Sequence, residues 1–100
     1  MAFDIRESDQ EIYVDVGGTI FVEDAALLRE KLHDLVDRGH NRFVINMQRA
    51  TYIDSSGLGV LVALHKRALQ QNGGVIIKGS QGVVKELFIM TRLNKVFEMQ

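Results

Sequence analysis

Residues 52–64, which read YIDSSGLGVLVAL, constrain the fold of this chain more than any other segment. Small polar residues give way there to apolar residues that recur every three or four positions from Leu58 onward, the spacing of one face of an α-helix. Basic residues and the run Asn72-Gly73-Gly74 follow, and both are typical of a helix C-terminus. The pattern predicts a helix from about Ser55 to Asn72.

This helix is apolar on more than one face. Val60 and Leu64 point away from the core-facing set, so the first half of the helix is apolar nearly all round. We expect Val60 and Leu64 to form an exposed apolar patch beside the start of the helix, where a partner protein can bind. The core-facing set comprises Leu58, Leu61, Val62, His65 and Leu69.

The first residues of the helix fit two roles, namely an N-terminal helix cap and a phosphorylation site that controls partner binding. Asp54 or Ser55 can act as N-cap by accepting a hydrogen bond from a backbone N–H of the first turn. A phosphate on Ser55 would be stabilised at this positive helix end by about 0.3–1 kcal/mol, or up to ~2 kcal/mol if partly buried. It would also place a charge of about −1.5 to −2 beside Asp54 and the expected patch, and so repel a partner. The residues alone leave both roles of Ser55 open, and Ser56 suits a supporting role.

Gly57 and Gly59 each cost a helix about 0.8–1 kcal/mol relative to alanine. Without a Cβ they allow another backbone to approach closely. That backbone can belong to the protein's own sheet or to a bound partner, and for Gly59 packing on the sheet is at least as good an explanation.

Composition limits the classes of partner. The chain has 100 residues, of which 46% are hydrophobic, and we expect residues 1–100 to form one domain. A net charge of −1, from 12 basic and 13 acidic residues, predicts binding neither to nucleic acid nor to an anionic membrane. With no cysteine and three scattered histidines, we predict no metal site and no cofactor.

We expect neither a secretory signal peptide nor a membrane span in this sequence. The N-terminus has no apolar core of a signal peptide. No run approaches the ~20 apolar residues that a membrane span needs. We therefore expect a cytoplasmic protein.

The chain before residue 52 predicts two strands, a helix and a third strand. Residues 3–6 and 11–16 alternate between apolar and polar, as in a hairpin whose second strand ends at Gly17-Gly18. Thr19 to Val22 is expected to be a packed apolar connection. A helix is predicted from Asp24 to about Arg38, and residues 42–47 form a central strand followed by a loop over residues 48–52. The core stripe of that first helix is Leu28, Leu32, Leu35 and Val36, and His33 and His40 are expected at the surface.

The remaining chain predicts a strand at Val75–Lys78 and a third helix capped by Ser80. The expected inward residues of that helix are Val83, Val84, Leu87 and Phe88, and residues 93–97 close the chain. The order β-β-α-β-α-β-α favours parallel pairing through right-handed crossovers. We predict an α/β fold, with a mixed four- or five-stranded sheet and helices packed on it.

Two enzyme classes fit poorly. The run Gly57-Leu58-Gly59 resembles half of a dinucleotide-binding fingerprint, but Val62 replaces the third glycine and Lys78 the ribose-binding acid. A serine hydrolase would need a G-x-S-x-G elbow, which Ser55 lacks. His65 lies on the core stripe, where we expect a packed, hydrogen-bonded histidine rather than a base. No catalytic residue is predicted.

The run Asp54-Ser55-Ser56-Gly57-Leu58-Gly59, set between a buried strand and a helix, resembles the signature of the bacterial anti-sigma-factor antagonists of the STAS domain family. The resemblance covers nearly the whole chain. It includes the second strand up to Gly18, Phe43-Val44-Ile45-Asn46 before the signature, and Val83 to Phe88, Leu93 and Phe97 after it.

The resemblance implies a regulatory protein that is controlled by phosphorylation and is not itself an enzyme. Family members bind an anti-sigma factor, which is also an ATP-dependent serine kinase of the GHKL type, and so release a sigma factor. The kinase phosphorylates the serine that follows the aspartate, here Ser55, and a PPM-type phosphatase reverses this. The implied partner-binding residues are Asp54, Ser56, Gly57, Leu58, Gly59, Val60, Leu64, Thr19 and Phe21.

One segment departs from the family pattern. The family often has a glycine, an acid, Leu or Ile and an aspartate after the second strand, whereas this chain has Gly18-Thr19-Ile20-Phe21. A non-phosphorylated STAS interaction module is therefore the alternative, such as a stressosome component, a secretion regulator or a lipid-transport accessory subunit.

Overall fold

The structure is a computed structural model that describes residues 3–100. Within them the chain forms one five-stranded sheet in the order β1-β2-β3-β4-β5. β1 pairs with β2 antiparallel, and every other neighbouring pair is parallel. The predicted α/β fold with a mixed sheet is confirmed. The strands are β1 (Phe3–Glu7), β2 (Ile12–Ile20), β3 (Arg42–Ile53), β4 (Gly74–Lys78) and β5 (Glu98–Met99).

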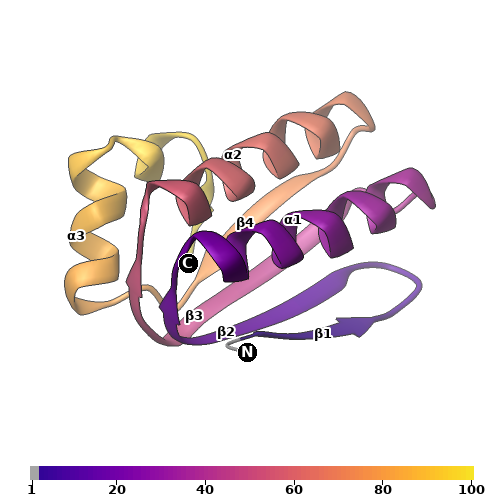
Figure 1. The fold of residues 1–100 in the computed structure, drawn as a ribbon. Coiled ribbons are helices and arrows are strands. Elements are labelled where there is room, and N and C mark those ends of the chain that lie inside the picture. Colours follow the sequence, from indigo (N-terminus) through magenta and orange to yellow (C-terminus); the bar gives the residue numbers. More distant parts are fainter. Residues whose placement is uncertain (1–2) are drawn as a thin grey trace.

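The helices of residues 3–100 lie on one side of this sheet (Figure 1). α1 and α2 run side by side over the strands, and α3 lies beyond the carboxyl end of β3 (Figure 1). They are α1 (Val22–Asp37), α2 (Ser55–Gln70) and α3 (Gly82–Met90), followed by the short 3₁₀ helix η1 (Leu93–Lys95).

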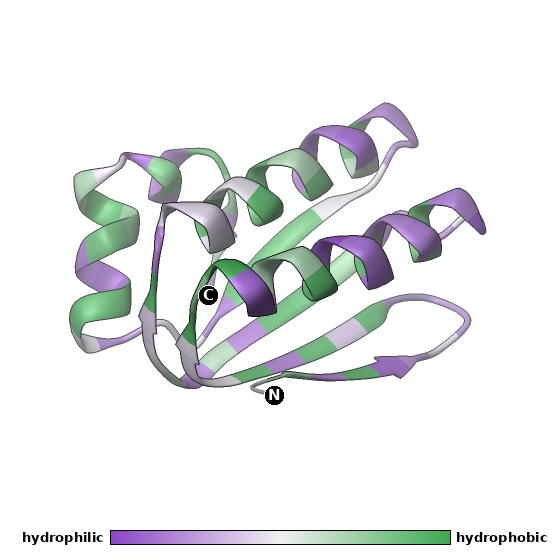
Figure 2. Ribbon diagram, viewed as in Figure 1, coloured by the Kyte–Doolittle hydropathy of each residue, from purple (hydrophilic) through white to green (hydrophobic). Residues whose placement is uncertain are grey.

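The core lies between the sheet and the helices. Ile12, Val14 and Val16 alternate along β2 and are at most 1% exposed, as predicted. The alternation of hydrophobic and hydrophilic residues along β2 is visible in Figure 2. The core stripe predicted for α1 is also buried. The Cα trace spans 32 × 28 × 19 Å, and the short dimension accommodates one sheet and one helix layer.

β2 and β3 are longer than the sequence predicted. β2 does not end at Gly17-Gly18, because Gly17 pairs with Arg49 and Gly18 with Ala50 across two register shifts. Gly18 has a φ of 67°, so it forms an irregularity within the strand instead of ending it. The segment predicted as a loop over residues 48–52 is therefore part of β3.

The connection before α1 was also predicted wrongly. α1 begins at Val22 and not at Asp24, because the Asp24 carboxylate accepts a hydrogen bond from the Phe21 N–H (3.4 Å) within the first turn. Phe21 and Val22 are 52% and 63% exposed rather than packed. Only Ile20 in this segment is fully buried.

The later helices differ from prediction mainly at their ends. α2 ends at Gln70, and Leu69 near this end is 54% exposed instead of facing the core. Ser80 does not cap α3, since Gln81 occupies the N-cap position. Val83 is 51% exposed, whereas Val84 and Phe88 are buried as predicted.

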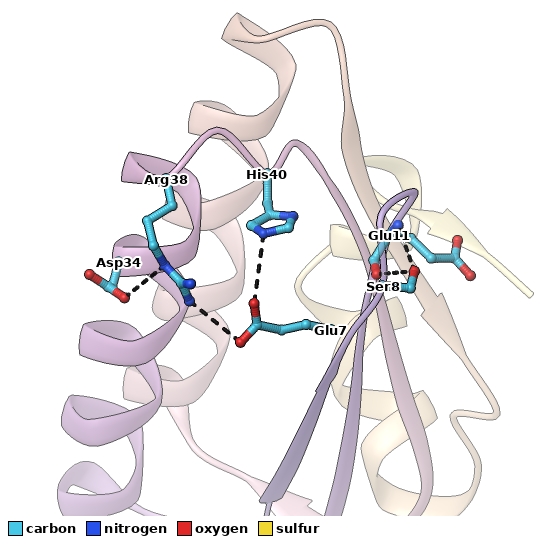
Figure 3. Close-up of polar contacts among 6 residues, drawn as sticks. All are labelled: Glu7, Ser8, Glu11, Asp34, Arg38 and His40. Atoms are coloured by element: carbon cyan, nitrogen blue, oxygen red, sulfur yellow. Dashed lines mark hydrogen bonds and ion pairs between the residues drawn. The ribbon is translucent and has the colours of Figure 1, made fainter.

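An ion-pair network fixes the β1–β2 hairpin to the end of α1 (Figure 3). Arg38 lies 3.3 Å from the carboxylate of Asp34 and 3.5 Å from that of Glu7. His40 approaches the second Glu7 oxygen at 3.8 Å. α1 has 16 residues and is therefore about 24 Å long, so this network lies far from the first turn of α1.

Candidate partner-binding site at two helix N-termini

α1 and α2 begin beside each other. Their preceding strands are parallel neighbours whose last residues, Ile20 and Ile53, are paired. The Asp54 N–H donates to the Ile20 carbonyl at 3.2 Å, which holds the two strand ends together. Because α1 then starts at Val22 and α2 at Ser55, the positive ends of both helix dipoles lie at one edge of the sheet.

Asp54 is the N-cap of α2. Its Oδ1 accepts a hydrogen bond from the Gly57 N–H at 3.0 Å, and its carbonyl accepts one from the Leu58 N–H at 3.0 Å. Ser55 is exposed, and its hydroxyl forms no hydrogen bond within the described part of the chain. The two candidates that the sequence left for the cap are thus resolved, and Ser55 is available for other chemistry.

The two glycines of the signature have different environments. A Cβ at Gly57 would lie 2.6 Å from Ile53 Cγ1 and 3.1 Å from Ile20 Cγ2. Gly57 therefore permits α2 to pack on its own sheet. Gly59 is exposed, and a Cβ there would meet no atom within 4 Å. The fold of residues 3–100 gives no packing reason for a glycine at this position, contrary to the sheet-packing explanation.

The apolar patch predicted at Val60 and Leu64 is not on the surface. Val60 is 6% and Leu64 0% exposed, and Leu58 is also buried, at 7%. The reason is that α2 packs against α1 as well as against the sheet, so its second apolar face is covered by α1. The apolar pattern of α2 does not show which elements cover its second face.

A different exposed apolar surface lies at this edge. Phe21, Val22 and Tyr52 are 52%, 63% and 38% exposed. The Phe21 and Tyr52 rings are 6.2 Å apart, and Thr19 beside them is exposed. Phe21 was predicted from the sequence as a partner-binding residue, whereas Val22 and Tyr52 were not. The signal that identifies them is their position, since Val22 directly follows the N-cap of α1 and Tyr52 lies two residues before the N-cap of α2.

An open groove of about 560 Å³ runs between α1 and α2 from this edge. Ser55, Ser56 and Gly59 line its α2 side, with Val60 in its wall. The α1 side is formed by Val22, Ala25, Ala26, Arg29 and His33, and Ala63 completes α2's contribution. Ser55 therefore lies where the groove meets the exposed apolar surface.

His33, predicted to be a surface residue, is part of the groove wall. Its Nδ1 lies 2.9 Å from Arg67 NH1, and because a guanidinium only donates, Nδ1 accepts and the ring proton is on Nε2. Arg67 also pairs with Asp37 at 2.6 Å. Burial, and then the charges of Arg67 and Arg29, lower the pKa of His33. Arg29 thus carries the fixed positive charge among the residues that line the groove.

His65 is structural, as the sequence predicted. Its Nδ1 accepts a hydrogen bond from the Val75 N–H at 3.0 Å, and its ring meets Phe97 edge-on at 5.2 Å. Burial lowers its pKa, and a hydrogen bond with the Val96 backbone opposes this effect. Among residues 3–100 no group of three His, Asp or Glu side chains could hold a metal ion. In that same range, no helix combines the length and apolar character required to cross a bilayer.

Comparison with known proteins identifies the family to which this fold belongs. The STAS domain family model matches residues 2–100, and the chain belongs to this family. It is 31% identical to the anti-sigma-B factor antagonist of Bacillus subtilis, over 96% of this chain and 87% of that protein. SpoIIAA in its unphosphorylated form superimposes with a TM-score of 0.84 at 17% identity, over 99% and 87% of the two chains. The phosphorylated form of the Bacillus cell fate determinant SpoIIAA also gives a TM-score of 0.84, at 18% identity over 99% and 89%.

Proposed function

We propose that this chain is an anti-sigma factor antagonist that is switched off by phosphorylation of Ser55. In its unphosphorylated form it binds an anti-sigma factor and so releases a sigma factor. The observation that carries this proposal is the position of Ser55, which is exposed and unbonded at the first position of α2, beside the apolar surface of Phe21, Val22 and Tyr52. The similarity to the anti-sigma-B factor antagonist of Bacillus subtilis supports it.

Binding is assigned to the surface around the two helix N-termini. Phe21, Thr19 and the α2 residues Asp54, Ser56 and Gly59 are the contact residues in this proposal. Aromatic side chains contribute large contact areas to interfaces, and a glycine without a packing role admits a close partner backbone. The other predicted residues of α2 contribute indirectly, because they are buried and their packing holds α2 in place. They are Gly57, Leu58, Val60 and Leu64.

Phosphorylation of Ser55 switches the interface without unfolding α2. The phosphate is favoured at the helix N-terminus by about 0.3–1 kcal/mol, so the helix persists. In the complex the same phosphate places a charge of about −1.5 to −2 beside the Asp54 carboxylate and a largely apolar contact surface. A 100-fold loss of affinity needs only about 2.7 kcal/mol, which an unpaired charge in an interface supplies.

The partners follow from this assignment. The anti-sigma factor is itself a serine kinase of the GHKL type, and a PPM-type phosphatase removes the phosphate. The chain acts as a regulator and not as an enzyme, without a cofactor. We place it in the cytoplasm, with neither nucleic acid nor membrane as partner, in keeping with its net charge of −1.

A second function is favoured by one observation. Thr19 and Phe21 occupy the positions where relatives often carry acids, and both are exposed. A surface altered in this way suits a STAS module that binds its partner constitutively, as in a stressosome, a secretion regulator or a lipid-transport accessory subunit. In that case phosphorylation at Ser55 would be absent.

Affinity purification from the native host tests the proposed function. Tagged wild type, Ser55→Ala, Ser55→Asp and the control Gln70→Glu, at the exposed far end of α2, are compared by quantitative mass spectrometry. We expect an anti-sigma factor of the kinase type with wild type, Ser55→Ala and Gln70→Glu, and about 100-fold less with Ser55→Asp. Equal recovery with Ser55→Asp would contradict the switch, and recovery of a different partner would favour the constitutive module.

A further inference from the structure

The face of the sheet opposite the helices carries a regular arrangement of side chains. Strand alternation directs Tyr13, Val44 and Ile76 away from the helices, because their neighbours Ile12, Val14, Phe43, Ile45, Val75 and Ile77 face the core. The three residues are paired in register across β2, β3 and β4. Arg6 on β1 and Glu98 on β5 complete the row at its two ends.

A second row of the same face is polar. Asp15 pairs with Asn46, and Asn46 pairs with Lys78 across β2, β3 and β4. Asp4 on β1 stands opposite Asp15. Two carboxylates directly opposite each other in a ladder are unfavourable. The β1–β2 side of this row is therefore negative and its β4 side positive.

A largely parallel sheet with one open face is unusual. Parallel strands occur mostly in sheets that are covered on both faces, yet α1, α2 and α3 all lie on one side (Figure 1). Val44 at the centre of the open face is 8% exposed, and Tyr13 and Ile76 beside it are half-buried. This face therefore has an apolar centre and charged edges, which is the anatomy of a protein interface.

The charges on this face are complementary to those of a second copy. The strand order is β1-β2-β3-β4-β5, so a twofold axis that runs along β3 exchanges β1 with β5 and β2 with β4. Arg6 of one copy then faces Glu98 of the other, and Asp15 faces Lys78. Each pair occurs twice because the interface is isologous. Val44 meets Val44, and Tyr13 meets Ile76.

Asp15 provides an independent sign that a cation is missing. Its Oδ1 is buried and has no hydrogen-bond partner among the described residues. Its Oδ2 is 3.7 Å from the guanidinium of Arg6, which also lies 4.9 Å from the centre of the Tyr13 ring. Lys78 is exposed, and no carboxylate of residues 3–100 lies within 4.0 Å of its ammonium group. The Asp15 side chain is 23% exposed on this face, so the second copy's Lys78 is placed to pair with the exposed part of its carboxylate.

We propose that the open sheet face, defined by the rows Arg6 to Glu98 and Asp15 to Lys78, is the interface of a homodimer. Five strands spaced about 4.8 Å apart give a face only roughly 20 Å wide, which places the dimer among weak associations that bury less than about 1,200 Å². Ser55 and the groove lie in the helix layer, so both copies can bind a partner. The dimer does not depend on the proposed function.

Charge reversal tests this interface directly. Lys78→Asp and Asp15→Lys each place like charges opposite each other in the homodimer and are expected to weaken self-association about tenfold or more. An equimolar mixture of the two variants restores both ion pairs, so it should associate as wild type does. Arg6→Glu and Glu98→Arg form a second, more exposed pair with the same expected behaviour. Lys85→Glu on exposed α3 is the matched control.

Sedimentation velocity over a range of concentrations, with circular dichroism of each variant, provides the measurement. The proposal is supported if wild type and Lys85→Glu dimerise, the single reversals do not, and the mixtures do. It is overturned if wild type stays monomeric at millimolar concentration, or if it dimerises and folded Lys78→Asp or Arg6→Glu dimerises equally well. The proposal is also overturned if neither mixture of complementary variants dimerises, because the complementary ion pairs define the interface.

Discussion

The Asp54 carboxylate accepts a hydrogen bond from the Gly57 N–H at 3.0 Å, and this bond caps α2 without Ser55. The two adjacent residues therefore have separate tasks. Asp54 stabilises the helix, and Ser55 presents a hydroxyl to solvent on the same turn. Ser55 can therefore be substituted or phosphorylated at little cost to the stability of the fold.

The first prediction separates these tasks by stability. Asp54→Ala should lower the free energy of unfolding by about 0.5–2 kcal/mol, because it removes an N-cap. Ser55→Ala should change it by less than about 0.5 kcal/mol, as for most surface substitutions. Urea denaturation followed by circular dichroism measures both. Equal destabilisation by the two variants would mean that Ser55 shares the cap.

The second prediction concerns the two glycines. Gly57→Ala should destabilise the protein by about 1–3 kcal/mol through overpacking, since the new Cβ would lie 2.6 Å from Ile53 Cγ1. Gly59→Ala should stabilise it by about 0.8–1 kcal/mol, because nothing lies within 4 Å of the new Cβ and alanine favours the helix.

Partner affinity provides the second readout for this pair. If Gly59 admits a close partner backbone, Gly59→Ala should bind the anti-sigma factor more weakly although it is more stable. Thermal melts and titration calorimetry together detect such opposite effects. Unchanged affinity in a stabilised Gly59→Ala would remove Gly59 from the interface.

The third prediction assigns binding to the exposed aromatic surface. Phe21→Ser should reduce partner affinity about tenfold or more, as expected for an aromatic anchor, with a small effect on unfolding because the side chain is 52% exposed. Leu69→Ser is the matched control, since Leu69 is 54% exposed at the far end of α2. If both variants bind like wild type, the contact surface lies elsewhere.

The fourth prediction is a dependence of stability on pH. The native pKa values of His33 and His65 lie below the usual 6.5, so the unfolded chain binds more protons than the native protein in this range. The free energy of unfolding should therefore be at its full value above about pH 7 and fall as the pH drops through 6.5 towards the lowered native values.

Denaturation at two pH values measures this effect. We expect wild type to be less stable at about pH 5.5 than at about pH 7.5, a window above the titration of most carboxyl groups. The difference should shrink in His33→Gln and in His65→Gln. A stability that rises on acidification would contradict the direction of both pKa shifts.

The sequence predicted the elements of this fold well because local periodicity decided them. The alternation at Ile12, Val14 and Val16 was confirmed. Of the helical stripe predicted from Leu58, the residues Leu58, Leu61 and His65 are buried, whereas Leu69 is exposed. Periodicity does not reveal which elements cover a second face. For that reason the contact of α2 with α1, which buries Leu64, was missed.

The candidate site was predictable only in part. Asp54 and Ser55 were identified because capping follows local rules, although the choice of cap needed the structure. The exposed surface of Val22 and Tyr52 depends on how the ends of β2 and β3 pair, and the irregular register around Gly18 has no simple sequence pattern. The sequence predicted a surface position for His33. It could not show the contact of His33 with Arg67, because this contact joins α1 to α2 across 34 positions of the chain.

Phosphosite mapping of the protein isolated from its native host tests the central claim most directly. Wild type and Ser55→Ala are compared by mass spectrometry under several growth and stress conditions, which requires no knowledge of the partner. We predict phosphate on Ser55 in wild type, in a fraction that changes with conditions, and none at Ser56 in either protein. The absence of phosphate on Ser55 under every condition would contradict the switch and favour a constitutive STAS interaction module.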